Sequence, residues 1–246
     1  MMRFKDRAVI VTGAAGGIGV GIATRLASEG ARLILADRDP DKAQAGVAAI
    51  KAAGAPDVWV CACDVSVEAQ VEAACDGALE RFGRLDAVVN NAGLMTFTPI
   101  EDLTGEEWQR VLGVDLMGAF YFTKHAFRRM KPGGSIVNIA SIHAVMTSPL
   151  AAPYAAAKAA VLSLTRTASI EGKPKGIRAN AVLPGAIDTP MLWDNPNIKS
   201  GAEKVDPADV GKPENIAAAV AFLASDDADF VTGASLAVDG GRLAKL

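Results

Sequence analysis

Several residue types that define other classes of protein are scarce in this chain of 246 residues. It has three cysteines, Cys61, Cys63 and Cys75, and its two histidines, His125 and His143, are not clustered with them. An odd number of cysteines gives no disulfide framework, and cysteines without histidine partners give no zinc site. We therefore expect inert, reduced thiols and no bound metal, as is typical of a cytoplasmic protein.

An excess of charge of one sign and long apolar runs are also missing. Lysine and arginine number 25 and aspartate and glutamate 28, which leaves a formal charge of −3. Such mild acidity provides no basic footprint for nucleic acid. The first residues, Met-Met-Arg-Phe-Lys-Asp, lack the apolar stretch of a signal peptide, and no later run is long enough to span a bilayer. We expect neither a nucleic-acid partner nor a membrane partner.

The chain does contain a regular alternation of short β-rich apolar runs and helical segments. This alternation predicts a parallel sheet with helices on both faces, and the length suits a single α/β domain. We expect one doubly wound Rossmann-type domain over residues 1–246, with a sheet of about seven strands. The strands are expected at residues 7–12, 32–37, 58–63, 85–90, 135–140, 177–183 and 236–238. The helices are expected between the glycine turn and Gly30 and at residues 41–53, 67–82, 105–130, 153–171 and 213–224.

One stretch, residues 191–212, departs from this alternation. It is rich in Asn, Asp, Pro and Gly. Long irregular segments in compact domains are often functional lids, so we expect a substrate lid here.

A glycine-rich turn follows the first expected strand. The segment Thr12-Gly13-Ala-Ala-Gly-Gly17-Ile18-Gly19 leads from this strand into a helix. Glycines let the backbone approach a pyrophosphate, and the helix N-terminus offers free N–H groups. The second strand ends at Asp37, at about the offset where an acid binds the adenosine ribose hydroxyls. These four features in register favour a dinucleotide site over a flexible turn with a solvated aspartate.

Tyr154 and Lys158 are four residues apart in an expected helix, so both side chains project from one face. A free tyrosine has a pKa of about 10 and is a poor base at neutral pH. A nearby fixed cation lowers that pKa toward the range that acid–base catalysis requires. The spacing alone also describes an ordinary surface pair, so its meaning depends on the other motifs.

Six motifs occur in order along the chain. They are Thr12-Gly13-x-x-x-Gly17-x-Gly19; Asn90-Asn91-Ala92-Gly93; Ser141, thirteen residues before the tyrosine; Tyr154-x-x-x-Lys158; Pro184-Gly185-Ala186-Ile187-Asp188-Thr189; and Val238-Asp239-Gly240-Gly241. Together they resemble the short-chain dehydrogenase/reductase family over essentially the whole chain. The set is far more specific than any one of its members.

The resemblance implies an NAD(P)-dependent oxidoreductase that moves a hydride between nicotinamide and a secondary alcohol or ketone. Tyr154 is then the acid/base, Lys158 lowers its pKa and binds the nicotinamide ribose, and Ser141 holds the reacting oxygen. The cofactor-binding residues expected on this basis are Gly13, Gly17, Ile18, Gly19, Asp37, Arg38, Asp64, Val65, Asn91, Ala92, Gly93, Tyr154, Lys158, Pro184, Gly185, Ile187 and Thr189. The expected substrate residues are Ser141, His143, Tyr154 and Trp193.

Asp115 departs from the family pattern and is included among the catalytic candidates. The family usually has an asparagine here, which kinks its helix and holds a water near the lysine. Aspartate keeps an acceptor but loses the amide donor, and its charge would raise the pKa of Lys158. We expect a working enzyme, with a weakly catalytic dinucleotide-binding sensor as the alternative.

Three finer expectations concern the cofactor, the substrate and the assembly. NAD is favoured over NADP because Asp37 repels a 2′-phosphate, although Arg38 could bind that phosphate. The favoured substrate is a small sugar, polyol or other hydroxy compound. The alternative is a 3-oxoacyl thioester on an acyl carrier protein, because reductases of such thioesters share these motifs. The resemblance also implies a homo-oligomer, most simply a tetramer.

Overall fold

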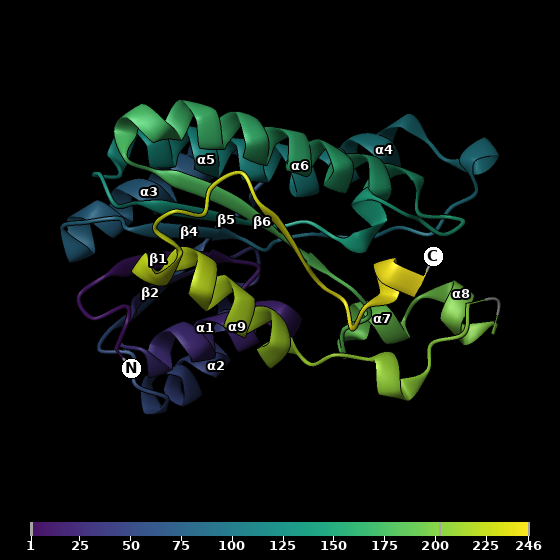
Figure 1. The fold of residues 1–246 in the computed structure, drawn as a ribbon, viewed down its shortest axis with the longest axis horizontal. Coiled ribbons are helices and arrows are strands. Elements are labelled where there is room, and N and C mark those ends of the chain that lie inside the picture. Colours follow the sequence, from purple (N-terminus) through teal and green to yellow (C-terminus); the bar gives the residue numbers. More distant parts are fainter. Residues whose placement is uncertain (1, 202, 246) are drawn as a thin grey trace.

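The computed structural model describes residues 2–201 and 203–245 and contains a seven-stranded sheet between two layers of helices (Figure 1). The strands are β1 (Ala8–Thr12), β2 (Arg32–Asp37), β3 (Val58–Ala62), β4 (Ala87–Asn90), β5 (Ser135–Ile139), β6 (Arg178–Pro184) and β7 (Ser235–Val238). Their order in the sheet is β3-β2-β1-β4-β5-β6-β7, and every neighbouring pair is parallel. The expected doubly wound α/β fold is confirmed.

The central strands are apolar on both sides because each side faces a separate core. In β1, Val9 and Val11 pack into one core, and Ala8 and Ile10 pack into the other. All five residues of β1 are buried. A strand buried on both faces reads as a continuous apolar run, which is why its position was visible in the sequence.

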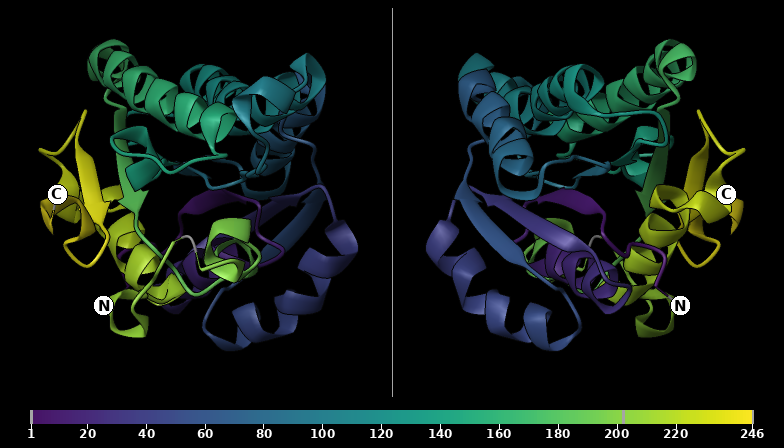
Figure 2. Two further views of the ribbon diagram at one scale, coloured as in Figure 1. Left: turned by 90° about the vertical axis from the view of Figure 1, so that its right-hand side faces the viewer. Right: turned by 90° about the vertical axis from the view of Figure 1, so that its left-hand side faces the viewer.

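The helices form the two outer layers. Helices α1 (Gly17–Ser28), α2 (Pro40–Ala52) and α9 (Pro213–Ala224) lie on one side of the sheet, and α3 (Glu68–Phe82), α4 (Gly105–Leu112), α5 (Gly118–Arg129) and α6 (Ala152–Gly172) lie on the other (Figures 1 and 2). No helix in residues 2–201 and 203–245 is long and apolar enough to cross a membrane.

The prediction of a single uninterrupted helix over residues 105–130 is wrong. The segment is divided into α4, a π-helical turn η2 (Gly113–Met117) and α5. The close packing of Gly118 on Val65 fits this division, because a Cβ on Gly118 would lie 2.8 Å from Cγ2 of Val65. A π-turn inserts an extra residue into a helix and occurs frequently at functional sites. Asp115 lies inside this turn and is 2 % exposed.

The sheet has one point where its strand order reverses. The chain adds β2 and β3 on one side of β1, and β4 to β7 on the other side. Ligands of open α/β sheets bind in the crevice at such a point, beyond the carboxyl ends of the strands. Between β6 and α9, the described residues form the short helices α7 (Pro190–Trp193) and α8 (Pro196–Lys199) and the turn η5 (Pro207–Asp209). Figure 1 shows α7, α8 and the C-terminal segment gathered at one end of the molecule.

Candidate active site

The turn after β1 has a backbone that requires glycine. Gly13 and Gly17 have positive φ angles of 62° and 51°. A Cβ on Gly19 would overlap the carbonyl oxygen of Gly13. Helix α1 then starts without a side-chain cap and without an acidic residue in its first turn. Its first N–H groups and the positive end of its dipole are therefore available to an anion such as a pyrophosphate.

A hydrogen-bond network joins this turn to the segment after β4. The hydroxyl of Thr12 accepts from the backbone N–H groups of Asn91 (2.9 Å) and Ala92 (2.8 Å). The Asn91 side-chain amide donates to the carbonyl oxygens of Thr12 (2.9 Å) and Gly13 (3.1 Å). Two segments far apart in the sequence thus form one rigid wall at the switch point of the sheet.

Asp37, at the end of β2, holds the same turn from the other side. Its Oδ2 accepts from the N–H of Ala15, and its Oδ1 accepts from the N–H of Asp39, both over 2.9 Å. The carboxylate therefore lies beside the glycine turn. Asp64, after β3, accepts from the N–H and hydroxyl of Ser66. The bond from the Ser66 hydroxyl lowers the pKa of Asp64, with a smaller contribution from the charge of Arg38.

A cleft of about 440 Å³ opens beyond the strand ends. The expected site residues that line it are Gly13, Gly17, Ile18, Asn91, Ala92, Gly93, Ser141, His143, Tyr154, Lys158, Pro184, Gly185, Ile187 and Thr189. The expected residues that lie outside its lining are Gly19, Asp37, Arg38, Asp64, Val65, Asp115 and Trp193.

Three candidate catalytic side chains meet in this cleft. Ser141 follows β5, and its hydroxyl accepts from the N–H of His143 over 3.1 Å, which orients the side chain. Tyr154 and Lys158 lie one turn apart on α6, and the Lys158 ammonium is 5.4 Å from the centre of the Tyr154 ring. All three are buried. The helix begins at Ala152 with Pro153 in its first turn, where the missing N–H of proline costs nothing.

Lys158 is held by one hydrogen bond and one ion pair. Its Nζ donates to the carbonyl oxygen of Ile139 over 3.0 Å and lies 3.0 Å from Oδ1 of Asp115. Oδ2 of Asp115 accepts from the N–H of Leu94 over 3.0 Å. Gly93 makes room for this pair, because a Cβ there would lie 2.8 Å from Asp115 Oδ1 and 3.3 Å from Lys158 Nζ. The ammonium group has three N–H donors, so donors beyond the one bonded to Ile139 remain for a ligand.

The charges in this group act on one another. Burial raises the pKa of Tyr154, the Lys158 ammonium opposes that rise, and the Asp115 carboxylate adds to it. Burial acts to lower the pKa of Lys158, but Asp115 and then Tyr154 outweigh it, so the pKa is raised and the lysine stays charged. Burial raises the pKa of Asp115, although Lys158 opposes this.

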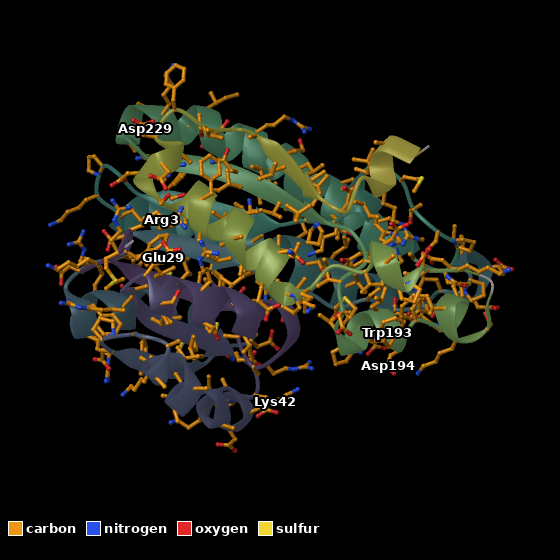
Figure 3. All side chains as sticks on the ribbon, turned by 60° about the horizontal axis from the view of Figure 1, so that its bottom comes forward. Arg3, Glu29, Lys42, Trp193, Asp194 and Asp229 are labelled. Atoms are coloured by element: carbon orange, nitrogen blue, oxygen red, sulfur yellow. The ribbon has the colours of Figure 1, made fainter. Side chains whose placement is uncertain are left out.

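The two remaining substrate candidates have different surroundings. The His143 ring packs edge-on against Tyr154, with ring centres 5.7 Å apart, and burial lowers the pKa of His143. Trp193 lies outside the cleft: it is 43 % exposed, and its indole N–H donates to Asp188 over 2.7 Å. Figure 3 shows Trp193 next to Asp194 at the outer edge of the molecule. The other three residues of helix α7, Pro190, Met191 and Leu192, line the cleft instead.

Known proteins resemble this chain over nearly its full length. A family model described as enoyl-(acyl carrier protein) reductase matches residues 13–242. A 3beta-hydroxysteroid dehydrogenase 1 of Eggerthella lenta is 41 % identical, with 96 % of this chain and 94 % of the relative covered. A cis-4-hydroxycyclohexanecarboxylate dehydrogenase of Sinomonas cyclohexanicum is 42 % identical, with 98 % of each covered. The crystal structure of a levodione reductase superposes with a TM-score of 0.93 at 39 % identity, covering 99 % of this chain and all of the other.

This chain belongs to the short-chain dehydrogenase/reductase family. The resemblance seen in the sequence motifs is thereby confirmed. Dehydrogenases of the family use a nicotinamide cofactor. The uncapped start of α1 and the tight turn at Gly13 and Gly17 fit the pyrophosphate of such a cofactor. In the described residues, no group of three or more His, Cys, Asp or Glu side chains is arranged to hold a metal.

The cleft of this dehydrogenase also contains residues that were not among the expected site residues. They are Gly16, Lys42, Met95, Ile139, Ala140, Ile142, Ala186, Pro190, Met191, Leu192, Asn195, Glu203 and Arg242. Of these, Ala186 belongs to the expected Pro-Gly segment, and Met191, Leu192, Asn195 and Glu203 belong to the expected lid. Lys42 is on α2, and its Nζ would lie 3.8 Å from a Cβ on Gly16. Its position five residues after Asp37 was the only signal for it. Glu203 and Arg242 come from separate segments, and no sequence pattern relates them.

Proposed function

We propose that this protein is an NAD-dependent dehydrogenase of small, uncharged secondary alcohols, working reversibly with the corresponding ketones. The observation that carries the proposal is the meeting of Ser141, Tyr154 and Lys158 in a cleft whose other end is the glycine turn beside Asp37. A nicotinamide in this cleft would accept or supply the hydride. The protein residues then have to position the substrate and move one proton.

Tyr154 is the proposed acid/base. Its phenolate removes the proton of the alcohol during oxidation, and its phenol returns a proton during reduction. Lys158 stabilises the phenolate by its charge, and its free N–H is available to a ribose hydroxyl. Ser141 donates to the reacting oxygen and stabilises the charge that develops there. Asp115 acts through Lys158 and is therefore a positioning residue.

The lining of the cleft supports the proposed substrate class. Met95, Ile142, Met191 and Leu192 give the cleft apolar side chains, while His143 and Asn195 add polar ones. Such a mixture suits a compact carbon skeleton with a few oxygen groups, such as a cyclic alcohol or a polyol. The names of the relatives, a hydroxysteroid dehydrogenase, a hydroxycyclohexanecarboxylate dehydrogenase and a levodione reductase, support a hydroxy compound or ketone as the substrate. One of them acts on a carboxylate, so the preference for an uncharged substrate rests on the lining of the cleft alone.

Reduction of a 3-oxoacyl thioester on an acyl carrier protein is the weaker candidate, although the matching family model carries an acyl-carrier-protein name. An acidic carrier requires a free basic surface. The basic residues Arg128, Arg129 and Lys131 lie at the end of α5, just before β5, and so at the edge of the sheet opposite the cleft. Arg129 is also bound by Asp76 (2.7 Å) and Glu72 (3.2 Å). This cluster is therefore not placed to dock a carrier at the cleft, which favours a free small molecule.

NAD is proposed over NADP because the Asp37 carboxylate would repel a 2′-phosphate beside the turn. The basic groups Arg38 and Lys42 oppose this preference without removing the repulsion. We also propose that residues 191–212 act as the lid over the substrate and that the enzyme works in the cytoplasm. Its three unpaired cysteines suit that compartment.

A homotetramer is proposed from exposed apolar side chains on two surfaces. Phe120 on α5 is 39 % exposed and Ile170 on α6 is 73 % exposed. On a second surface, Phe230 is fully exposed, and the edge strand β7 beside it has the exposed Leu236. Exposed apolar groups of this size mark interaction surfaces, and two such surfaces are what a tetramer of paired dimers needs.

The decisive test is a panel of assays with both cofactors. NAD-linked oxidation of cyclic alcohols, polyols and aldoses is measured beside NADH- and NADPH-linked reduction of acetoacetyl thioesters. We expect oxidation of alcohols with NAD. Efficient thioester reduction without alcohol oxidation would reverse the ranking, and tight cofactor binding without any turnover would instead favour the sensor.

A further inference from the structure

Two opposite charges from distant parts of the chain meet in the wall of the cleft. Glu203 comes from the segment after α8, and Arg242 begins the C-terminal turn η7 (Arg242–Lys245). Both line the cleft, and Nη2 of Arg242 donates to Oε1 of Glu203 over 2.5 Å. Their charges also act on His143, Glu203 raising and Arg242 lowering its pKa. The pair lines the same cleft as His143, whose ring packs on Tyr154, and as the α7 residues Met191 and Leu192.

Both members of the pair are fixed by the backbone around them. The N–H of Glu203 donates to the carbonyl oxygen of Asn197, whose side-chain amide donates to the carbonyl of Pro149, just before α6. On the other side, the Asp239 carboxylate accepts from the N–H groups that flank Arg242. The two charged groups are therefore preorganised relative to the helix that carries Tyr154.

The ion pair between Glu203 and Arg242 leaves hydrogen-bonding groups without partners. Oε2 of Glu203 is buried and has no hydrogen-bond partner in the described part of the chain. A buried carboxylate oxygen without a donor costs free energy, and a donor on a bound molecule would recover it. The guanidinium of Arg242 has five N–H donors, so further donors remain beside the one bonded to Glu203.

We propose that Glu203 and Arg242 form a second polar subsite, which selects uncharged substrates bearing a hydroxyl group remote from the carbon that reacts. A hydroxyl donates to Glu203 and accepts from Arg242, so it satisfies both. A carboxylate at the same place is repelled by Glu203, and an ammonium is repelled by Arg242. This inference rests on the proposed alcohol dehydrogenase activity and specifies the substrates of that activity. They are diols and hydroxyketones rather than simple alcohols or hydroxy acids.

The test compares three substrates with one ring size. Cyclohexanol has no remote group, cyclohexane-1,4-diol has a remote hydroxyl, and 4-hydroxycyclohexanecarboxylate has a remote anion. We measure kcat/KM for each with NAD. The diol has two equivalent hydroxyls, so a twofold advantage over cyclohexanol is statistical. A hydrogen bond to a charged partner adds about tenfold or more, and we expect a total advantage of about twentyfold.

Two variants and a control localise this advantage. Glu203→Ala should reduce the advantage of the diol over cyclohexanol to about twofold. It should also raise kcat/KM for the carboxylate, because Arg242 is then free to bind an anion. Arg242→Ala should reduce the diol advantage without improving the carboxylate. Lys199→Ala breaks an exposed ion pair between the end of α8 and Asp194, and it should leave kcat/KM for all three substrates unchanged.

Each outcome decides the matter. If Glu203→Ala lowers all three activities in proportion, the ion pair only fastens the segment after α8 and the subsite is refuted. If wild-type enzyme oxidises cyclohexanol and the diol equally well per hydroxyl, the subsite is refuted while the alcohol dehydrogenase activity stands. If none of the three is oxidised but acetoacetyl thioesters are reduced, the proposed function fails and the subsite with it.

Discussion

The carboxylate of Asp115 lies 3.0 Å from the ammonium of Lys158, and both side chains are almost completely buried. Asp115 is the point at which this chain departs from its family, and the π-turn η2 presents it to the lysine. Breaking a buried ion pair leaves an uncompensated charge, so the carboxylate is coupled to the lysine energetically as well as by position. Through Lys158 it also acts on the proposed base, Tyr154.

Asp115→Asn should shift the pH profile of alcohol oxidation toward acid. Oxidation requires the Tyr154 phenolate, so kcat/KM rises as pH passes the pKa of Tyr154. The Asp115 charge raises that pKa, and its removal lowers it. We expect the acidic limb to move down by about one pH unit, with activity near neutral pH retained or increased. The measurement is kcat/KM from pH 6 to 10, with Asp194→Asn as an exposed control. A large loss at every pH would show that the carboxylate has another role.

The sheet and its crevice could be predicted because apolar runs and turn residues are local signals. The strand expected at residues 32–37 and the helix at 213–224 coincide with β2 and α9. The pattern of residues 105–129 reads as one continuous helical segment, and only the family resemblance indicated an irregularity, through the helix kink expected at Asp115. In the structure this irregularity is the π-turn η2, and Gly118 packs closely on Val65 beside it.

The candidate site also contains some residues that the sequence predicts and others that it does not. Motif residues such as Ser141 and Tyr154 were predictable because a fixed spacing brings them together. Glu203 and Arg242 meet only because the segment after α8 and the C-terminal turn fold to the same end of the cleft. Trp193 was predicted as a substrate residue from its chemistry, but the orientation of a four-residue helix decides which of its side chains enter the cleft.

Tyr154→Phe should reduce turnover by about 10²–10⁴-fold while leaving cofactor affinity nearly unchanged. The substitution removes one hydroxyl and keeps the ring that packs against His143. Turnover is measured with a substrate from the alcohol panel, and NADH affinity by fluorescence titration. Tyr121→Phe is the matched control, because Tyr121 is the other tyrosine of the chain and lies on α5 outside the cleft. Retention of more than a few per cent of activity by Tyr154→Phe would exclude the acid/base role.

Asp37→Ser should narrow the preference for NAD over NADP by at least about tenfold. The substitution removes the charge that repels a 2′-phosphate and leaves Lys42 and Arg38 available to bind it. Affinity for NAD should also fall, because the Asp37 carboxylate holds the N–H of Ala15 in the turn. Adding Lys42→Ala to this variant should weaken NADP selectively. Equal use of both cofactors by the wild-type enzyme would contradict the assigned preference.

The protein should be a tetramer at micromolar concentration, measured by light scattering coupled to gel filtration. Phe230→Glu places a charge on the exposed apolar surface beside β7 and should give dimers, because the surface with Phe120 and Ile170 remains intact. Phe120→Glu should give dimers through the other surface. A monomer in the wild-type sample would refute the assembly.

Asn138→Ala should lower the free energy of unfolding by about 1–3 kcal/mol, measured by urea denaturation. The buried side chain of Asn138 accepts from the Asn90 amide (2.7 Å) and donates to the Thr165 hydroxyl (2.8 Å), which ties β4 and β5 to the helix of Tyr154. Thr165→Val should cost a similar amount, because it leaves the Asn138 amide without its acceptor. The double variant should lose less unfolding free energy than the two single variants together, because neither side chain is then left as a buried polar group without its partner. Costs that add within about 0.5 kcal/mol would mean that the two side chains act independently and that no shared network supports the catalytic helix.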